Sequence, residues 1–210
     1  MGEKDITEKM LEAHNDVFAD IVNVLLFNGE RIVSPEELEE ADPRSRYKAK
    51  GKFHELERDI LKRVTEGNIH VASIGFENQS MPDPDMPFRV LAYDGTEYMR
   101  QKAHNGHVEH PVVTLVLYFN YERPWTYPCS VKEQLKKPNR FEPYYSDYTF
   151  NLFQIADLTP EQVQLFQSDF REVADYFVQK KQNGDYKPDL RVVDHMQETL
   201  QMLTAVSNDR

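Results

Sequence analysis

The sequence predicts an α/β fold, in which helices flank a layered sheet. Two apolar runs, residues 69–78 and 112–119, are typical of buried strands. The second run is β-branched at its start and predominantly apolar, as expected of a central strand covered on both faces. Segments with helical periodicity separate these strands, and such alternation is typical of an α/β layered sheet.

Helices are expected in the N-terminal part of the chain. Residues 5–28 carry apolar side chains at the i, i+3, i+4 and i+7 spacing of one helix face. Ser34, followed by Pro35, is a capped start for a short second helix, and the acidic run 36–40 would lie on its surface. The apolar residues around Asp59 also follow a helical spacing, which predicts a helix there.

The pattern continues toward the C-terminus. Residues 88–102 fit a helix, and residues 150–156 fit another strand. Between the strands at 112–119 and 150–156 lies a long proline-bearing segment, 121–148, with one short helical piece. Loops of that length inside a compact domain are usually functional or poorly ordered.

Two C-terminal helices are expected after the core. Thr159 opens a capping box, and the apolar residues behind it are spaced three and four apart as far as Asn183. Apolar residues further on mark a last helix. We therefore expect one domain over residues 1–210, with a core at about 5–158 and C-terminal helices at about 159–206.

Composition narrows the class of protein. No apolar run approaches the ~20 residues needed to span a bilayer, and the charged N-terminus leads into no signal-like apolar region. Cys129 is the only cysteine, which excludes an internal disulfide and fits a reducing compartment. These features predict a cytoplasmic protein without a membrane span.

The net charge of −11 argues against a generally basic nucleic-acid binder. However, residues 44–63 carry eight basic and three acidic side chains, a local charge of +5. The stretch is either a solvated loop or a patch that faces phosphate. In the second case, Lys50, Lys52 and Arg58 would contact a DNA backbone.

The strand at 69–78 ends in polar residues whose spacing suggests chemistry. Glu77 and Gln79 are two apart, so they would share one face of the strand. A magnesium ion takes oxygen ligands, and it can polarise a phosphate and lower the pKa of a bound water. We expect Glu77 and the backbone carbonyl of Asn78 to bind Mg²⁺ (or Mn²⁺), and Gln79 to orient water or phosphate. Arg89 opens the next helix and could contact phosphate or form a structural salt bridge.

A second carboxylate has to come from another segment. Asp59, 18 residues before Glu77, is the best candidate. Asp16 and Asp20 are four apart on the first predicted helix, so they share a face and could add one more ligand.

The order of these blocks resembles the Rpn family of recombination-promoting nucleases, also described as putative transposases, within the PD-(D/E)XK nuclease superfamily. The likeness rests on Asp59, on Glu77-Asn78-Gln79-Ser80, and on the blocks at 15–20, 86–94, 112–118 and 168–177. In this version of the motif, Gln79 stands in place of the catalytic lysine.

The resemblance implies a restriction-endonuclease-like fold and Mg²⁺-dependent DNA endonuclease activity associated with recombination. It implies metal-binding acids at Asp59 and Glu77, with Gln79 in the third position of the motif. Asp20 would take the acidic position of the first helix, although Asp16 fits nearly as well.

Two other classes of function stay open. A degenerate nuclease fold could bind DNA or a protein without cutting, as the glutamine at position 79 and the acidic net charge suggest. The heptad-like helix predicted at 160–183 could instead make the chain an interaction module or a homodimer.

Overall fold

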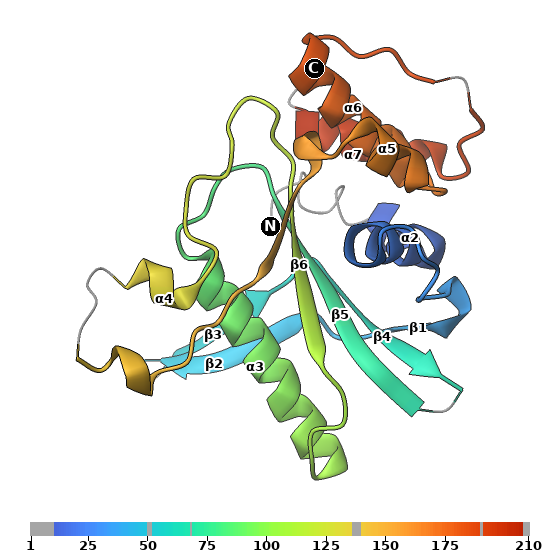
Figure 1. The fold of residues 1–210 in the computed structure, drawn as a ribbon. Helices are drawn as coiled ribbons and strands as arrows, with labels where there is room; N and C mark the ends of the chain where they lie inside the picture. Colours follow the sequence, from blue (N-terminus) through green and yellow to red (C-terminus); the bar gives the residue numbers. More distant parts are fainter. Residues whose placement is uncertain (1–10, 50–51, 68, 136–139, 190, 208–210) are drawn as a thin grey trace.

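The computed structural model describes residues 11–49, 52–67, 69–135, 140–189 and 191–207. Its centre is a five-stranded mixed sheet with the strand order β1-β4-β5-β6-β7 (Figure 1). The strands are β1 (Leu38–Glu40), β4 (Ile60–Glu66), β5 (Ile69–Gln79), β6 (Val112–Tyr118) and β7 (Asn151–Gln154). The β1–β4 and β4–β5 pairs are antiparallel, whereas the β5–β6 and β6–β7 pairs are parallel. The predicted α/β fold with a mixed sheet flanked by helices is therefore confirmed, and it is consistent with a restriction-endonuclease-like architecture.

Helices cover both faces of the sheet. The long helix α3 (Met86–Asn105) crosses one face, and the other is covered by α2 (Asn15–Phe27) and by C-terminal helices (Figure 1). The C-terminal helices are α5 (Pro160–Leu165), α6 (Phe170–Asn183) and α7 (Met196–Ser207). Short helical turns complete the described chain: η1 (Pro35–Glu37), α4 (Val131–Gln134), η2 (Glu142–Tyr144) and η3 (Ile155–Asp157).

The alternation of side chains along β5 divides the interior into two layers. Ile74 and Phe76 point toward α2, where the Phe76 ring stacks on Phe18 with ring centroids 4.3 Å apart. Ser73 and Glu77 point instead toward α3, because successive side chains of a strand alternate between faces. The main hydrophobic core therefore lies on the α2 and α6 side, and a smaller cluster that includes Met86 and Val90 lies under α3.

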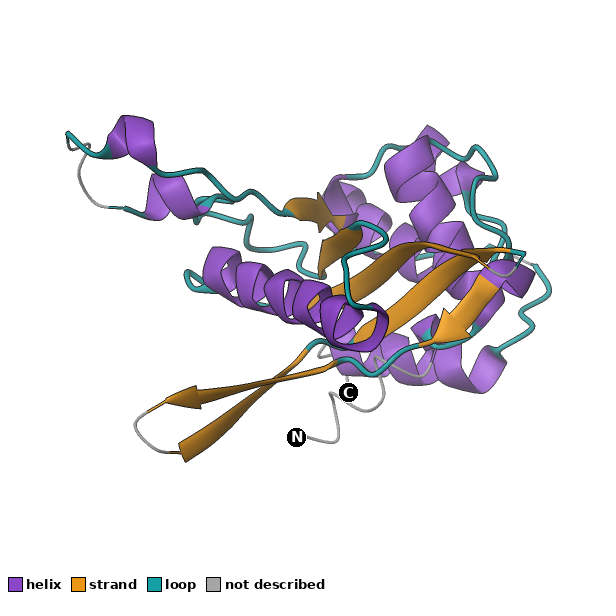
Figure 2. Cartoon of the chain, turned by 90° about the horizontal axis from the view of Figure 1, so that it is seen from below, coloured by secondary structure: helices purple, strands orange, loops and turns teal. Residues whose placement is uncertain are grey.

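A separate β-hairpin projects from this body (Figure 2). It consists of β2 (Arg44–Ala49) and β3 (Lys52–Glu57), which pair antiparallel as a two-stranded sheet. Much of the basic stretch predicted to face phosphate lies on this hairpin. Lys50 and the side chain of Lys52 lie outside the described part of the chain, so their predicted contacts stay predictions.

The helix predicted around Asp59 is wrong. Asp59 lies between β3 and β4, and the apolar residues around it belong to strands. Strand β4 has neighbours on both sides and helices over both faces, so the consecutive residues Ile60 and Leu61 are both buried. A strand buried on both faces does not show the alternation of apolar and polar residues by which strands are recognised. The helical spacing of its apolar residues is therefore a coincidence.

The acidic run 36–40 was also assigned incorrectly to a helix surface. Only the single turn η1 forms, capped at Ser34 as expected, and the chain then enters β1. Strand β1 pairs with β4 so that Glu39 is opposite Arg63 and Glu40 is opposite Lys62. These opposite charges across the strands favour the edge strand over a helix.

Two predicted helices are interrupted. In the first segment, Leu11 and Glu12 are helical, Ala13 and His14 interrupt the helix, and α2 begins at Asn15; residues 1–10 lie outside the description. The helix predicted behind Thr159 has the expected capping box but divides into α5 and α6, because Phe166 has an extended backbone (ψ 131°). The last helix begins at Met196, after the residues at which its pattern was expected to start.

Within the described residues, no helix combines the length and the apolar character needed to cross a bilayer. The assignment of all 210 residues to a single domain stays a prediction.

Candidate active site

The polar end of β5 faces helix α3. Glu77 is almost fully buried, and Gln79 Nε2 donates a hydrogen bond of 3.1 Å to Glu77 Oε1. This contact confirms that the two side chains share a face of the strand. Glu77 Oε1 also accepts a close hydrogen bond from Arg89 Nη2, whereas buried Oε2 has no hydrogen-bond partner among the described residues.

Asp59 lies beside this strand end. Its backbone N–H donates to the carbonyl oxygen of Phe76 at 3.1 Å, and its Oδ2 accepts from the backbone N–H of Asn78 at 2.6 Å. Because Ile60 pairs with Phe76 in the β4–β5 ladder, the Asp59 carboxylate accepts the hydrogen bond that the next carbonyl of a longer strand would accept. The structure therefore holds Asp59 against the backbone on either side of Glu77, from a strand end and not from a helix. Shared metal binding by the two carboxylates stays a prediction.

Burial and charge raise the pKa of Glu77 to about 8. Loss of hydration contributes most, the negative charge of Asp59 adds to it, and Arg89 opposes both. Repulsion between the half-buried Asp59 carboxylate and the buried Glu77 carboxylate would be reduced by a nearby cation. A cation bound beside Glu77 would favour its charged form and oppose this shift.

Arg89 lies in the first turn of α3 and contacts three oxygen-bearing side chains. Besides Glu77, its guanidinium donates to Asp83 Oδ2 at 2.9 Å and to the Tyr93 hydroxyl at 3.1 Å. Of the two roles left open for Arg89, the described contacts are those of a salt bridge. Tyr93 in turn donates to the carbonyl oxygen of Glu57 at 3.2 Å, which connects α3 to the end of the β2–β3 hairpin.

A third acid reaches this strand end from a residue that sequence patterns did not single out. Glu12 is fully buried, and its Oε2 accepts a hydrogen bond of 2.7 Å from Asn78 Nδ2. Since Asn78 and Glu77 are adjacent on a strand, their side chains point to opposite faces. Glu12 therefore supports the strand from the α2 side. Glu12 is one of several acids in the segment predicted as a helix over 5–28, and only its burial in the structure distinguishes it from the others.

The two acids predicted on the first helix lie elsewhere. Asp20 Oδ2 accepts hydrogen bonds from the backbone amides of Gln167 and Ser168 at 2.8 and 2.7 Å, at the α5–α6 junction. Asp16 pairs with His195 in front of α7. Asp20 is thus used to hold a chain turn, and we leave it out of the proposed catalytic set.

Arg58 is likewise not placed to contact DNA, because only 1% of its surface is exposed. Its guanidinium donates to Thr114 Oγ1 at 3.1 Å and to Asp94 Oδ1 at 3.3 Å beneath α3. The prediction that Arg58 contacts phosphate is therefore wrong, since a buried ion pair holds its charge inside the protein.

Most of the chain matches one protein family. Residues 55–210 match the family model described as "Putative transposase, YhgA-like". The chain belongs to this YhgA-like family. This confirms the family recognised from the sequence blocks and indicates a role related to transposition. Searches of curated proteins and of solved structures found no match.

The family match covers Asp59, Glu77, Gln79 and Arg89, and it begins after Glu12. Asp59 and Glu77 supply carboxylate oxygens at one strand end of this YhgA-like protein. The carbonyl of Asn78 leaves the strand on the same side as its N–H, which is the side of Asp59. This all-oxygen donor set fits a hard cation such as Mg²⁺, and Glu77 Oε2 has no hydrogen-bond partner in the described part of the chain.

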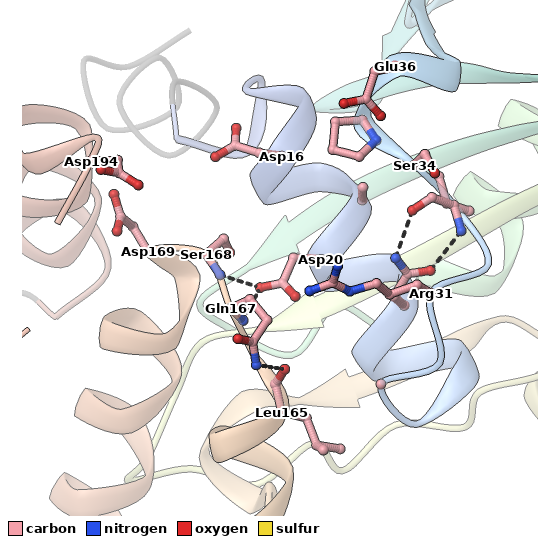
Figure 3. A pocket seen from close by; sticks show the side chains of 15 residues that line it. Asp16, Asp20, Arg31, Ser34, Glu36, Leu165, Gln167, Ser168, Asp169 and Asp194 are labelled. Atoms are coloured by element: carbon pink, nitrogen blue, oxygen red, sulfur yellow. Dashed lines mark hydrogen bonds between the residues drawn. The ribbon is translucent and has the colours of Figure 1, made fainter. Parts of the chain in front are cut away.

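A cavity of about 670 Å³ lies away from this strand end, between α2, the segment before η1 and the α5–α6 junction (Figure 3). Acidic side chains line it, among them Asp20, Glu36 and Asp169, with Arg31 as the basic exception. Because DNA phosphates are repelled by carboxylates, this cavity does not suit the substrate expected for the YhgA-like family. We therefore place the candidate active site at the end of β5.

Proposed function

We propose that this YhgA-like chain is a metal-dependent DNA endonuclease that acts in recombination or transposition, with Mg²⁺ or Mn²⁺ as cofactor and the cytoplasm as its location. The observation that carries the proposal is the approach of Asp59 to Glu77 at the end of β5. The two carboxylates repel each other and Glu77 is buried, so a cation bound between them would offset the repulsion.

Each residue has a distinct part in the proposed reaction. Asp59, Glu77 and the carbonyl of Asn78 would hold the cation, which when bound supplies charge neutralisation and an acidic water. Gln79 would orient the attacking water or the phosphate through its amide. Arg89 would be drawn less strongly to Glu77 once a cation shares that charge, so its guanidinium could turn toward the scissile phosphate.

The β2–β3 hairpin would guide the DNA. It leads directly into Arg58 and Asp59, so a duplex lying along it would reach the proposed site. Arg100 fastens the hairpin base by donating to the carbonyl oxygens of Asp42 and Arg44 at 2.7 and 2.6 Å. The basic residues of the hairpin, including Lys50 and Lys52, would contact the phosphate backbone.

Plasmid nicking tests the proposal directly. Supercoiled plasmid is incubated with the full chain and Mg²⁺ or Mn²⁺, and open-circle product is measured over time. Asp59→Asn and Glu77→Gln should each lower the rate at least ~100-fold, because each removes a metal-binding charge. Glu66→Gln, an exposed position at the end of β4, is the matched control and should nick like wild type. If Glu77→Gln nicks as fast as wild type, the assignment fails.

One observation favours the rival function, a fold that binds DNA without cutting. Glu77 already has two hydrogen-bonding partners, Arg89 and Gln79, so its charge is partly offset without a metal. DNA binding that weakens steeply with salt, without nicking in either metal, would establish this rival.

The interaction-module hypothesis has lost its physical basis. The apolar residues predicted on its contact face, such as Phe166, Phe170 and Phe177, are fully buried in the core. A homodimer formed through other surfaces stays a prediction.

A further inference from the structure

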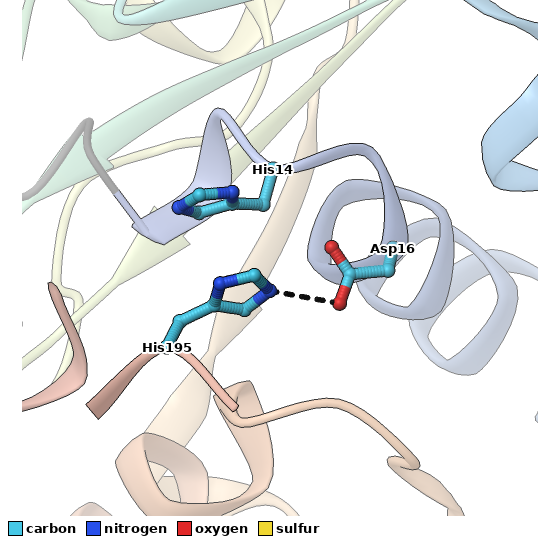
Figure 4. Close-up of side chains that lie close together, drawn as sticks. All are labelled: His14, Asp16 and His195. Atoms are coloured by element: carbon cyan, nitrogen blue, oxygen red, sulfur yellow. Dashed lines mark hydrogen bonds and ion pairs between the residues drawn. The ribbon is translucent and has the colours of Figure 1, made fainter. Parts of the chain in front are cut away.

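Two histidines from opposite ends of the chain lie against each other at the surface. His14 precedes α2, His195 precedes α7, and their rings stack with centroids 3.8 Å apart (Figure 4). Asp16, in the first turn of α2, lies 3.0 Å from His195 Nε2. One ligand atom from each of these three residues lies within 4.8 Å of the other two.

A fourth side chain with a ligand atom borders this group. Glu198, in the first turn of α7, places Oε1 4.0 Å from His14 Nε2. The four residues therefore form two pairs, one from the start of α2 and one from the start of α7. All four side chains are partly exposed, so an ion could reach them from solvent.

The backbone that carries these side chains is held in place. The His195 N–H donates to Asp169 Oδ2 at 2.5 Å, and its carbonyl oxygen accepts from Thr199 Oγ1 at 2.8 Å. The His14 N–H donates to the carbonyl oxygen of Leu11 at 3.2 Å. The backbone of both histidines is thus positioned by the fold.

The chemistry of the group matches a borderline transition metal. Neutral imidazoles suit Zn²⁺, whereas Mg²⁺ prefers oxygen ligands alone. Zinc bonds of about 2.0–2.2 Å in a tetrahedron put neighbouring donor atoms roughly 3.4 Å apart. The 3.0 Å separation of His195 Nε2 and Asp16 Oδ2 is near that value, and ligand atoms of His14, Asp16 and His195 all lie within 4.8 Å of one another. Three protein ligands leave the fourth position of the tetrahedron for water.

We propose that His14, Asp16 and His195 bind one Zn²⁺ ion, which fastens the start of α7 to the start of α2. This site is separate from the proposed Mg²⁺ site and does not depend on nuclease activity. Zinc binding would also affect the proposed active site, because Glu12 lies two residues before His14 and accepts a hydrogen bond from Asn78. Zinc binding would thereby fix the segment that buries Glu12.

Titration of the metal-stripped full chain with ZnCl₂, in excess Mg²⁺, tests the site by calorimetry. Wild type should bind one equivalent of zinc, and Co²⁺ in its place should give the visible absorption of a tetrahedral site. His195→Ala should weaken zinc binding at least ~100-fold, since a ligand is lost. His14→Gln and His195→Gln retain side-chain size and keep the test valid if the alanine variant unfolds.

Matched controls separate this site from other ligands in the chain. His104→Ala and His107→Ala remove exposed histidines at the end of α3, and Cys129→Ser removes the only thiol. All three should bind zinc like wild type, and so should Glu77→Gln, which alters only the proposed Mg²⁺ site.

Hydrogen exchange tests whether zinc binding stabilises α7. Zinc should slow hydrogen exchange of α7 amides in wild type but not in His195→Gln. The proposal is overturned if wild type binds no zinc, or if the His14 and His195 variants bind it as tightly as wild type. The pair would then be a ring stack with an ion pair only.

Discussion

Asp59 Oδ2 and the backbone nitrogen of Asn78 are 2.6 Å apart, joined by a hydrogen bond across the end of the β4–β5 ladder. This hydrogen bond holds the Asp59 carboxylate beside Glu77 although the bond itself is made to the backbone. The position of Asp59 is therefore set by the strand pairing of its neighbour Ile60. A local backbone arrangement thus produces the acidic pair on which the proposed function depends.

Loss of Glu12 should impair nicking although Glu12 does not face the substrate side. Glu12→Ala removes the acceptor for Asn78 Nδ2, so the strand end that presents Glu77 loses support. We expect the nicking rate to fall at least ~10-fold, with purified protein still folded by circular dichroism. Asp20→Asn is the comparison, because Asp20 binds the α5–α6 junction. If Asp20→Asn lowers the nicking rate more than Glu12→Ala does, Asp20 belongs to the catalytic set and the role given to Glu12 is wrong.

The stability of the metal-free protein should fall as the pH rises. The folded-state pKa of Glu77 is raised to about 8 from 4.5, so the folded protein holds a proton that the unfolded chain releases. That contribution is complete below about pH 4.5 and is lost as the pH approaches 8. Urea unfolding in EDTA should show a loss of a few kcal/mol over this range relative to Glu77→Gln, whose free energy of unfolding should change less. Equal pH dependence of the two proteins would contradict this prediction.

Removal of the Arg58 guanidinium should strongly destabilise the fold. Arg58→Ala leaves Asp94 buried without its ionic partner and also removes the side chain that packs over the Tyr93 ring. Breaking such a buried pair costs about 3–5 kcal/mol in the free energy of unfolding. Arg44→Ala removes an exposed arginine that pairs with Asp42, and it should cost less than about 1 kcal/mol by the same urea titration. Similar losses for both variants would show that burial does not decide the outcome.

Gly75 should not accept a larger side chain. A Cβ atom there would lie 2.7 Å from Arg58 Cδ and 2.9 Å from the carbonyl oxygen of Ile60. Gly75→Ala should therefore lower the free energy of unfolding by about 1–3 kcal/mol. Gly95→Ala, in helix α3 with open space around it, should be neutral or stabilising by up to about 1 kcal/mol. Thermal melts of both variants give the comparison, and a stable Gly75→Ala would contradict the close approach of Arg58.

Segments with an unambiguous local pattern were predicted well. The strands at 69–78 and 112–119, the helix at 88–102 and the capping box at Thr159 all form close to their expected positions. In each, apolar periodicity and end signals agree, so the local preference and the fold point to the same structure. Glu77 and Gln79 share a face for this reason, because the alternation of a strand is a local property.

The remaining features depend on which segments meet in space. Strand β4 was mistaken for a helix because burial on both faces removes alternation, and α5 and α6 separate where Asp20 binds the backbone between them. Glu12 could not be distinguished from other helix acids, because its burial depends on a strand 66 residues away. Local sequence sufficed for the strand that presents Glu77 and for the family of the protein. Only tertiary packing brought Asp59 to that strand, buried Glu12 behind it and placed His14 against His195, since these contacts join residues far apart in the chain.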